Sequence, residues 1–250
     1  MPKKRTKSSP LKAGVNTPVY GIYGRWRDQF YGDQVVSVRH IPPNRRSVTG
    51  LVPSPKNGRS VAYESLLERD FATLLEFDAD VLRYEEQPLE LRFRGPNGRW
   101  RVGYPDFLVY VRPSVDPVPM LCDVKFRKEI FERWTDLKPR LKAAYGYARE
   151  RGWTYRIKTE VEIRTPLLNN AKFLLPYGRC EPDSEHEIQL VHQLRELDES
   201  TPEGLILACY GPSWERAVLL PTLWCLIARG IISCDLNEPL TMRSTLWLVD

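Results

Sequence analysis

From residue 61 onward, hydrophobic and polar positions follow the periods of helices and strands. Residues 64–77 have helical spacing, because their apolar positions recur three and four residues apart: Leu67, Phe71, Leu74 and Leu75. Two-residue alternation then predicts a strand at 89–93, a turn at 95–98, and a second strand from Trp100 through Asp106 to Val111. A proline-rich turn at 113–119 leads to a third strand at 120–126. The pattern therefore predicts a helix followed by three meandering strands.

A second helix and a fourth strand follow. Residues 128–151 are basic and helical in pattern, and the segment ends at Gly152. Residues 155–163 alternate as a strand. This order of elements indicates an α/β fold with a mixed-sheet core.

The C-terminal third has a different pattern. Residues 166–182 are predicted to be a linker. A first helix is predicted at 185–197. A second is predicted to begin at Thr201-Pro202, which supplies an N-cap and a first-turn proline. A third is predicted at 213–229 and ends at Gly230. Two short strands, 231–234 and 246–249, complete the pattern. Three helices and a terminal hairpin predict a small winged-helix-like domain over residues 183–250.

Charge is unevenly distributed along the 250 residues, which carry a net charge of +5. Residues 1–60 hold 12 Lys or Arg and two Asp or Glu, whereas residues 165–250 hold six and 12. Residues 1–17 are basic, polar and without hydrophobic period, which predicts a disordered arm suited to a polyanion. We therefore expect this arm, an α/β domain at 18–165, the linker and the C-terminal domain.

Cysteine usage and hydropathy argue against several classes of protein. The five cysteines are odd in number, scattered and without a CxxC pair, and three histidines are too few for a zinc site. No apolar run reaches the roughly 18 residues of a membrane helix. We expect a reduced, cytoplasmic protein without a membrane partner.

Two acid-x-lysine triplets occur, Asp123-Val124-Lys125 and Asp136-Leu137-Lys138, and composition alone produces about one or two. On a strand, residues i and i+2 share a face, so Asp123 and Lys125 project together while Val124 points into the core. On a helix such residues do not face each other. The first triplet is therefore a candidate site, and the second is predicted to be a solvated helix surface.

Two further carboxylates can converge on the first triplet. Asp106 lies on the strand predicted to pair with that of Asp123, and Glu68 projects beside the apolar stripe of helix 64–77. Each acid alone is typical of a solvated or strand-end residue. Together they form the oxygen set that hard divalent ions prefer, and two such ions can orient water for phosphoryl displacement. The Lys125 ammonium can stabilise the transition state or help to deprotonate water.

The order helix Glu, strand Asp, strand Asp-x-Lys resembles the PD-(D/E)xK nuclease core, here Pro105-Asp106, sixteen residues, then Asp123-Val124-Lys125. The segment LLERDFATLLEFDADVLRYEEQPLELRF, followed by YPDFLV and DVK, further resembles the TnsA family, the endonuclease subunit of a two-protein cut-and-paste transposase. The resemblance is strong over about residues 35–165 and looser beyond. It implies a restriction-endonuclease-like fold.

The resemblance also implies the site residues. The catalytic set falls on Glu68, Asp106, Asp123 and Lys125, of which Glu68, Asp106 and Asp123 would bind metal. Asp123 is a departure, because the family often has Gln or Glu there. Glu64, one helical turn before Glu68, remains a rival for its role, and Gln87 is expected to support a site residue or the backbone.

The implied function is Mg²⁺-dependent cleavage of the 5′ strands at transposon ends, with two ions and with Mn²⁺ able to substitute. The implied partners are double-stranded DNA, a TnsB-like transposase subunit that handles the 3′ ends, and a TnsC-like AAA+ ATPase. The ATPase would dock on the C-terminal domain, whose net negative charge disfavours DNA. A stand-alone restriction or junction-resolving nuclease, and a DNA-binding assembly module with a decayed site, remain alternatives.

Overall fold

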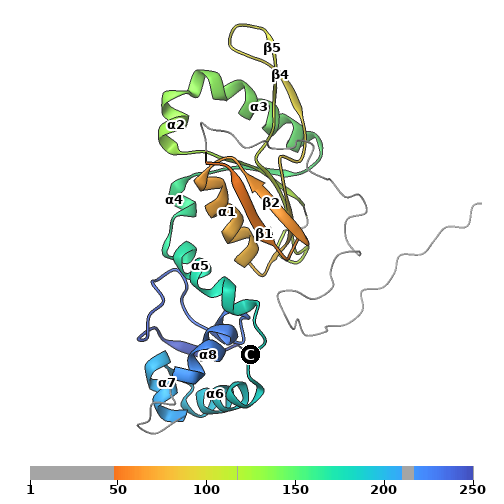
Figure 1. The fold of residues 1–250 in the computed structure, drawn as a ribbon. Helices are drawn as coiled ribbons and strands as arrows, with labels where there is room; N and C mark the ends of the chain where they lie inside the picture. Colours follow the sequence, from red (N-terminus) through yellow and green to blue (C-terminus); the bar gives the residue numbers. More distant parts are fainter. Residues whose placement is uncertain (1–47, 117, 210–216, 250) are drawn as a thin grey trace, which may run out of the picture.

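A computed structural model describes residues 48–116, 118–209 and 217–249 (Figure 1). The predicted basic arm lies outside these residues. The core is a four-stranded mixed sheet of β3 (Val81–Glu86), β6 (Phe107–Val111), β7 (Met120–Val124) and β8 (Thr154–Lys158), in the order β3-β6-β7-β8. The pairs β3–β6 and β6–β7 are antiparallel, whereas β7 and β8 are parallel. The predicted α/β fold with a mixed sheet is confirmed.

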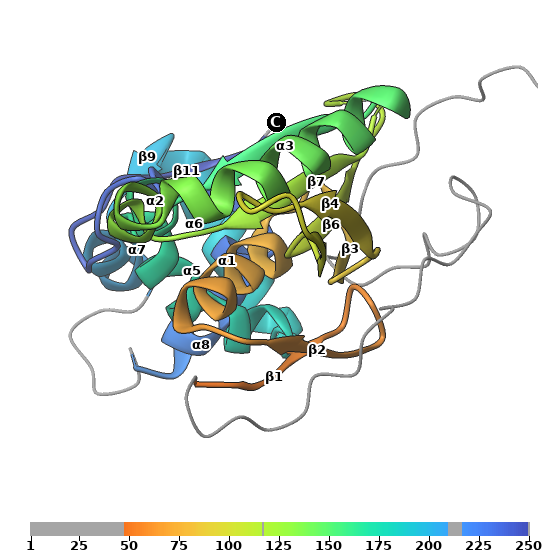
Figure 2. The ribbon, with the colours of Figure 1, turned by 90° about the horizontal axis from the view of Figure 1, so that it is seen from above.

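Helices cover both faces of this sheet (Figure 2). Helix α1 (Leu66–Phe77) buries Leu67, Phe71 and Leu75 against one face. Helix α3 (Trp134–Glu150) packs Ala144 and Ala148 against the other. Because strand side chains alternate, Cys122 and Val124 face α1, whereas Leu121 and its neighbour Asp123 face α3.

Two β-hairpins flank the sheet. The first, β1 (Gly50–Ser54) with β2 (Arg59–Tyr63), lies beside α1. It is held by Arg59, whose guanidinium bonds Glu86 at 2.6 Å, and by Ser54, whose hydroxyl donates to Glu76 at 2.6 Å. The second hairpin, β4 (Leu91–Arg94) with β5 (Trp100–Gly103), extends beyond α3 at the end of the molecule remote from the C-terminal helices (Figure 1).

Several element boundaries differ from the sequence pattern. Strand β3 is not predicted by that pattern, and the strand expected at 100–111 is two strands, β5 and β6, which belong to different sheets. The helix expected at 128–151 divides at Arg133 into α2 (Arg127–Glu132) and α3. The strand expected at 155–163 stops at Lys158, because Thr159 and Glu162 form a capping box that begins α4 (Glu160–Ile163).

The linker expected at 166–182 is wrong over most of its length. Residues Pro166–Gly178 form helix α5, with Thr165 at the N-cap and Pro166 in the first turn. Leu168, Ala171 and Leu174 are buried along one face of this helix. Burial of that apolar stripe makes the segment part of the packed structure rather than a spacer.

The C-terminal residues form a separate hydrophobic cluster around Leu190, Leu205 and Leu223. Its elements are α6 (Ser184–Leu197), β9 (Glu199–Ser200), α7 (Pro202–Cys209), α8 (Leu219–Ala228), β10 (Ile232–Ser233) and β11 (Leu246–Leu248). The three short strands pair antiparallel in the order β10-β11-β9. The winged-helix-like interpretation of this module stays a prediction.

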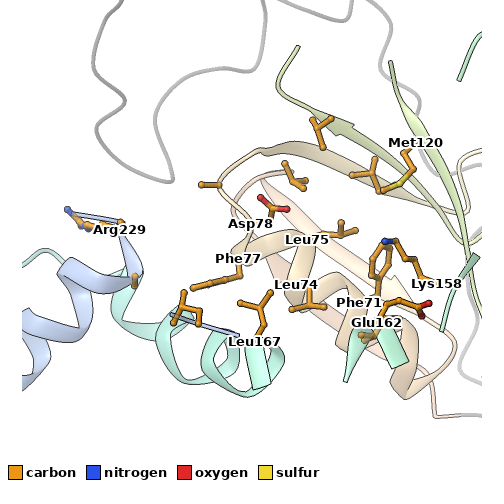
Figure 3. Close-up of a pocket in the computed structure, with 18 of the residues that line it drawn as sticks. Phe71, Leu74, Leu75, Phe77, Asp78, Met120, Lys158, Glu162, Leu167 and Arg229 are labelled. Atoms are coloured by element: carbon orange, nitrogen blue, oxygen red, sulfur yellow. The ribbon is translucent and has the colours of Figure 1, made fainter. Parts of the chain in front are cut away.

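Helices α1 and α5 join the core to this C-terminal module. Asp70 on α1 is buried and accepts hydrogen bonds from Lys172 at 2.8 Å and from Arg164 at 3.1 Å. An apolar cavity of about 480 Å³ lies nearby (Figure 3), with lining that includes Phe71, Leu74, Phe77, Leu167 and Ile227. Within the described residues, no helix is long and apolar enough to cross a membrane.

Candidate active site

Asp106 lies just before β6, at the point where three strands meet. Its backbone N–H donates to the Cys122 carbonyl of β7 at 3.0 Å, and its own carbonyl accepts from Gln87 N–H, after β3, at 2.9 Å. The sheet therefore fixes the backbone of Asp106 from both sides. The Gln87 main chain makes this contact with a φ of 43°. Its side chain is buried and its Oε1 has no hydrogen-bond partner within the described residues, so a supporting role of the side chain stays a prediction.

Lys125 pairs with Asp106 rather than with Asp123. Its ammonium donates to Asp106 Oδ2 at 2.8 Å and to the Val124 carbonyl at 2.9 Å. The Val124 N–H donates to the same Oδ2 at 2.6 Å. The Asp-x-Lys triplet is thus not an ion pair within one strand, because its lysine reaches across to the neighbouring strand's carboxylate.

The second triplet behaves as predicted. Asp136, Leu137 and Lys138 lie on α3, where Leu137 is buried and the Asp136 side chain is 57% exposed. Asp136 lies 3.9 Å from Arg101 of β5 and contributes to no carboxylate cluster among the described residues.

Asp123 is fully buried and is held by two residues that the sequence pattern does not single out. The Tyr155 hydroxyl of β8 donates to Oδ2 at 2.6 Å. The Arg140 guanidinium of α3 lies 2.6 Å from Oδ1 as an ion pair, and its Nη1 donates to the Tyr104 carbonyl at 2.8 Å. Side chains from β8 and α3 therefore position the Asp123 carboxylate on the α3 side of the sheet.

Arg140 reaches this position past a glycine. A Cβ on Gly103 would lie 2.8 Å from Arg140 Cδ and 3.1 Å from the Phe93 ring. Real Cβ atoms essentially never approach as closely as the first of these distances, so a larger residue would displace the arginine. Gly103 thus keeps open the path from α3 to Asp123.

Glu68 closes the N-terminus of α1. Its carboxylate accepts from the Glu64 N–H at 2.7 Å and from the Ser65 hydroxyl at 3.1 Å, while Ser65 Oγ accepts from the Glu68 N–H. Ser65 is the N-cap, so Glu64 precedes the helix instead of standing one turn back on it. Glu68 therefore has a capping role that is independent of any chemistry.

The charges of these groups interact. The pKa of Glu68 is raised to about 7, mainly by burial and next by the nearby charge of Asp106, against the opposing effects of the Glu64 N–H and of Lys125. Burial and the charge of Asp106 likewise raise the pKa of Asp123. Burial lowers the pKa of Lys125, but the two aspartates outweigh it and raise the pKa overall. Asp106 and Lys125 therefore interact electrostatically with both Glu68 and Asp123.

The carboxylate oxygens of the site differ in their availability to a divalent ion. Asp123 Oδ1 is buried and accepts no aligned hydrogen bond within the described part of the chain, although Arg140 neutralises it. A hard cation prefers carboxylate oxygens, and at Oδ1 it would have to displace the Arg140 guanidinium. However, no group of three or more Asp, Glu, His or Cys among residues 48–116, 118–209 and 217–249 lies close enough to hold a metal. The three-carboxylate metal site stays a prediction.

The apolar cavity near α5 is not part of this site. None of the four candidate residues lines it.

A mixed sheet flanked by helices, with an aspartate before one strand and Asp-x-Lys at the end of the next, defines the class of restriction-endonuclease-like nucleases. Two family models match the chain: "TnsA-like endonuclease N terminal" over residues 78–160 and "TnsA endonuclease C terminal" over residues 162–236. Together they cover more than half of the sequence. The chain belongs to the TnsA family of transposon endonucleases.

The two family matches include three of the four candidate site residues. Asp106, Asp123 and Lys125 lie within the N-terminal match, whereas Glu68 precedes it. Helix α5 falls within the C-terminal match. No curated protein matches the chain.

Proposed function

We propose that this chain cleaves the 5′ strands at transposon ends as the endonuclease subunit of a heteromeric cut-and-paste transposase. The family supports the activity. The observation that carries the site assignment is the hydrogen bond from Lys125 Nζ to Asp106 Oδ2, which joins two neighbouring strands. Asp106 also interacts electrostatically with Glu68 and with Asp123.

Asp106 and Asp123 would hold the metal, with Glu68 joining them when it releases its capping hydrogen bonds. We propose Mg²⁺, with Mn²⁺ as a substitute and two ions in the complete site. When bound, such ions neutralise charge on a phosphodiester and make a bound water more acidic.

The chain's own residues have separable roles in this proposal. Tyr155 and Arg140 hold the Asp123 carboxylate in one orientation. Lys125 uses two of its three N–H groups on Asp106 Oδ2 and the Val124 carbonyl. The remaining N–H can donate to a phosphate oxygen, where charge develops during cleavage.

The proposed partners are transposon-end DNA, a TnsB-like subunit for the 3′ strands and a TnsC-like AAA+ ATPase. The acidic composition of the C-terminal module supports docking to protein rather than to DNA, because phosphates would repel it. A restriction-type or junction-resolving nuclease would act without these partners.

The test uses Asp106→Ala and Asp123→Ala, with Asp136→Ala from the solvated triplet as the matched control. Strand-specific labelling of a plasmid with transposon ends, in Mg²⁺ with a TnsB-like partner, should show loss of 5′ cuts for the first two variants only. Joining by the partner should then yield fused replicons. Normal 5′ cleavage by either site variant would overturn the assignment, and cleavage of plain plasmid without a partner would favour the stand-alone nuclease.

A further inference from the structure

The β4–β5 hairpin has a composition that its own folding does not require. Residues 91–103 contain Arg92, Arg94, Arg99 and Arg101 and no acidic residue. The two strands form a sheet of their own, joined by a turn in which Gly98 has a φ of 72°. The hairpin is therefore a positively charged ribbon attached to the nuclease core. Glu90, just before it, pairs with Arg92 at 3.2 Å but leaves that side chain 79% exposed.

One face of this ribbon packs against α3. Leu91 is buried with Ala144 and Ala148, and Gly103 lies against the Arg140 side chain. On the same face Arg101 lies 3.9 Å from Asp136. These contacts account for the inner face of the ribbon and fix its direction relative to the core.

The opposite face is exposed. The register pairs Arg92 with Val102 and Arg94 with Trp100, so all four side chains share that face. Trp100 is 67% exposed and Val102 is 51% exposed, and the Arg94 guanidinium lies 5.1 Å from the centroid of the Trp100 ring. Charged residues on an edge strand commonly prevent it from pairing with another chain. A solvent-exposed tryptophan does not serve that purpose.

The ribbon is also directly connected to the proposed catalytic carboxylates. Only Tyr104 and Pro105 separate the end of β5 from Asp106. The Tyr104 carbonyl accepts from Arg140, which also pairs with Asp123. A four-residue strand spans about 14 Å, less than half of a ~34 Å turn of DNA. A duplex positioned at Asp106 can thus reach the exposed face within one helical turn.

Resting on the function proposed above, we infer that the exposed face of the β4–β5 ribbon binds duplex DNA beside the cleavage site. Arg92 and Arg94 contact phosphates, and Trp100 packs against the sugars and base edges of the groove. Arginine in this setting provides salt-dependent affinity without sequence information. A two-stranded ribbon is narrow enough for the ~12 Å major groove.

The experiment measures binding of the full chain to a blunt DNA duplex of about 30 base pairs by fluorescence anisotropy, with Ca²⁺ in place of Mg²⁺. The NaCl concentration is varied from about 25 to about 200 mM, roughly the range over which phosphate contacts dominate the affinity. The double variant Arg92→Gln/Arg94→Gln should reduce the slope of log affinity against log salt by about two. With lysine instead of glutamine at position 94 (Arg92→Gln/Arg94→Lys), part of the lost slope should return. Trp100→Ala should weaken binding about tenfold with little change in slope.

Arg243→Gln, an exposed charge removed from the C-terminal module, is the matched control and should bind like the parent chain. Thermal unfolding confirms that each variant is folded, which is expected because the substituted side chains are exposed. Unaltered affinity and slope in the ribbon variants, or no DNA binding by the parent chain at the lowest salt, would overturn the inference. Loss of cleavage in Asp106→Ala with unaltered binding by the ribbon variants would retain the proposed function and reject the ribbon.

Discussion

At the scale of single residues, Lys125 separates a structural from a catalytic interpretation of the Asp-x-Lys triplet. It bonds Asp106, and only two of its three donors are engaged by described residues. Its ammonium is not a metal ligand, so its removal isolates charge stabilisation from metal binding.

Lys125→Ala should lower single-turnover cleavage by about 10²–10³-fold, the usual effect of deleting one transition-state donor. Metal affinity, measured by calorimetry on the same folded preparation, should change little. Lys125→Arg should restore activity only in part, because a planar guanidinium does not replace a compact ammonium. Lys138→Ala, from the solvated triplet, is the control. Unchanged cleavage, or a loss explained entirely by lost metal, would reject the catalytic role.

Glu68 and Glu64 can be distinguished by paired amide substitutions. Glu68→Gln should reduce cleavage by about 100-fold or more, because it removes a charge that interacts with Asp106 and Lys125. Glu64→Gln should have a much smaller effect, since Glu64 precedes the helix and uses its backbone N–H to contact Glu68.

Stability provides the control for this pair. The Glu68→Gln variant retains an acceptor for the helix cap, so its melting temperature should stay close to that of the parent chain. Glu68→Ala removes this acceptor and should lower the free energy of unfolding by about 0.5–2 kcal/mol. If Glu64→Gln proved the more damaging variant for cleavage, the assignment of the helix carboxylate would be wrong.

At the scale of elements, the junction between α1 and α5 includes a buried carboxylate, Asp70, beside the apolar contacts of the two helices. Asp70 on α1 accepts from Lys172 on α5 and from Arg164 just before it. Asp70→Asn should lower the free energy of unfolding by about 1–3 kcal/mol, because it weakens charged hydrogen bonds.

Urea denaturation of Asp70→Asn, Lys172→Met and the double variant would measure this junction. The double variant should be more stable than the sum of the single effects implies, since both substitutions remove the same contact. Asp80→Asn, which alters an acid with a side chain 49% exposed, should change stability by less than about 0.5 kcal/mol. Strict additivity of the single effects would show that the Asp70–Lys172 contact does not couple the helices.

The errors of element prediction at this scale have local causes. Thr165-Pro166 carries the same N-cap and first-turn proline signal as Thr201-Pro202, and it begins α5, where a linker is predicted. Thr159 and Glu162 fit a capping box, which marks the end of β8. Strand β3 lacks alternation because Glu85 and Glu86 are both buried, paired with Arg59 of the β1–β2 hairpin. The first two signals could be read from sequence, and the third could not.

At the scale of the whole molecule, the distribution of charge predicts how the chain approaches DNA. Residues 1–17 carry five Lys or Arg and no acid, and they lie outside the described residues. Removing them should weaken DNA binding more at low salt than at high salt, with a loss of up to about 0.9 in the salt slope for each phosphate contact removed.

The truncated chain can be compared with the parent by the same anisotropy measurement. Combining the truncation with Arg92→Gln/Arg94→Gln should give additive losses in slope if the arm and the ribbon contact separate phosphates. An unchanged slope after truncation would show that the arm is a tail without a role in binding.

The sequence by itself determined the α/β class, the α1 stripe and the residue types of the nuclease core, because helical and strand periodicities report which positions are buried locally. Only the tertiary structure decided which groups meet. Lys125 contacts Asp106 because β7 pairs with β6, and Tyr155 reaches Asp123 because the parallel register places Tyr155 opposite Leu121 on the α3 side. Arg140 reaches the same aspartate past Gly103. These contacts join residues far apart in the chain, and strand register and helix packing, which set them, depend on the complete fold rather than on any local pattern.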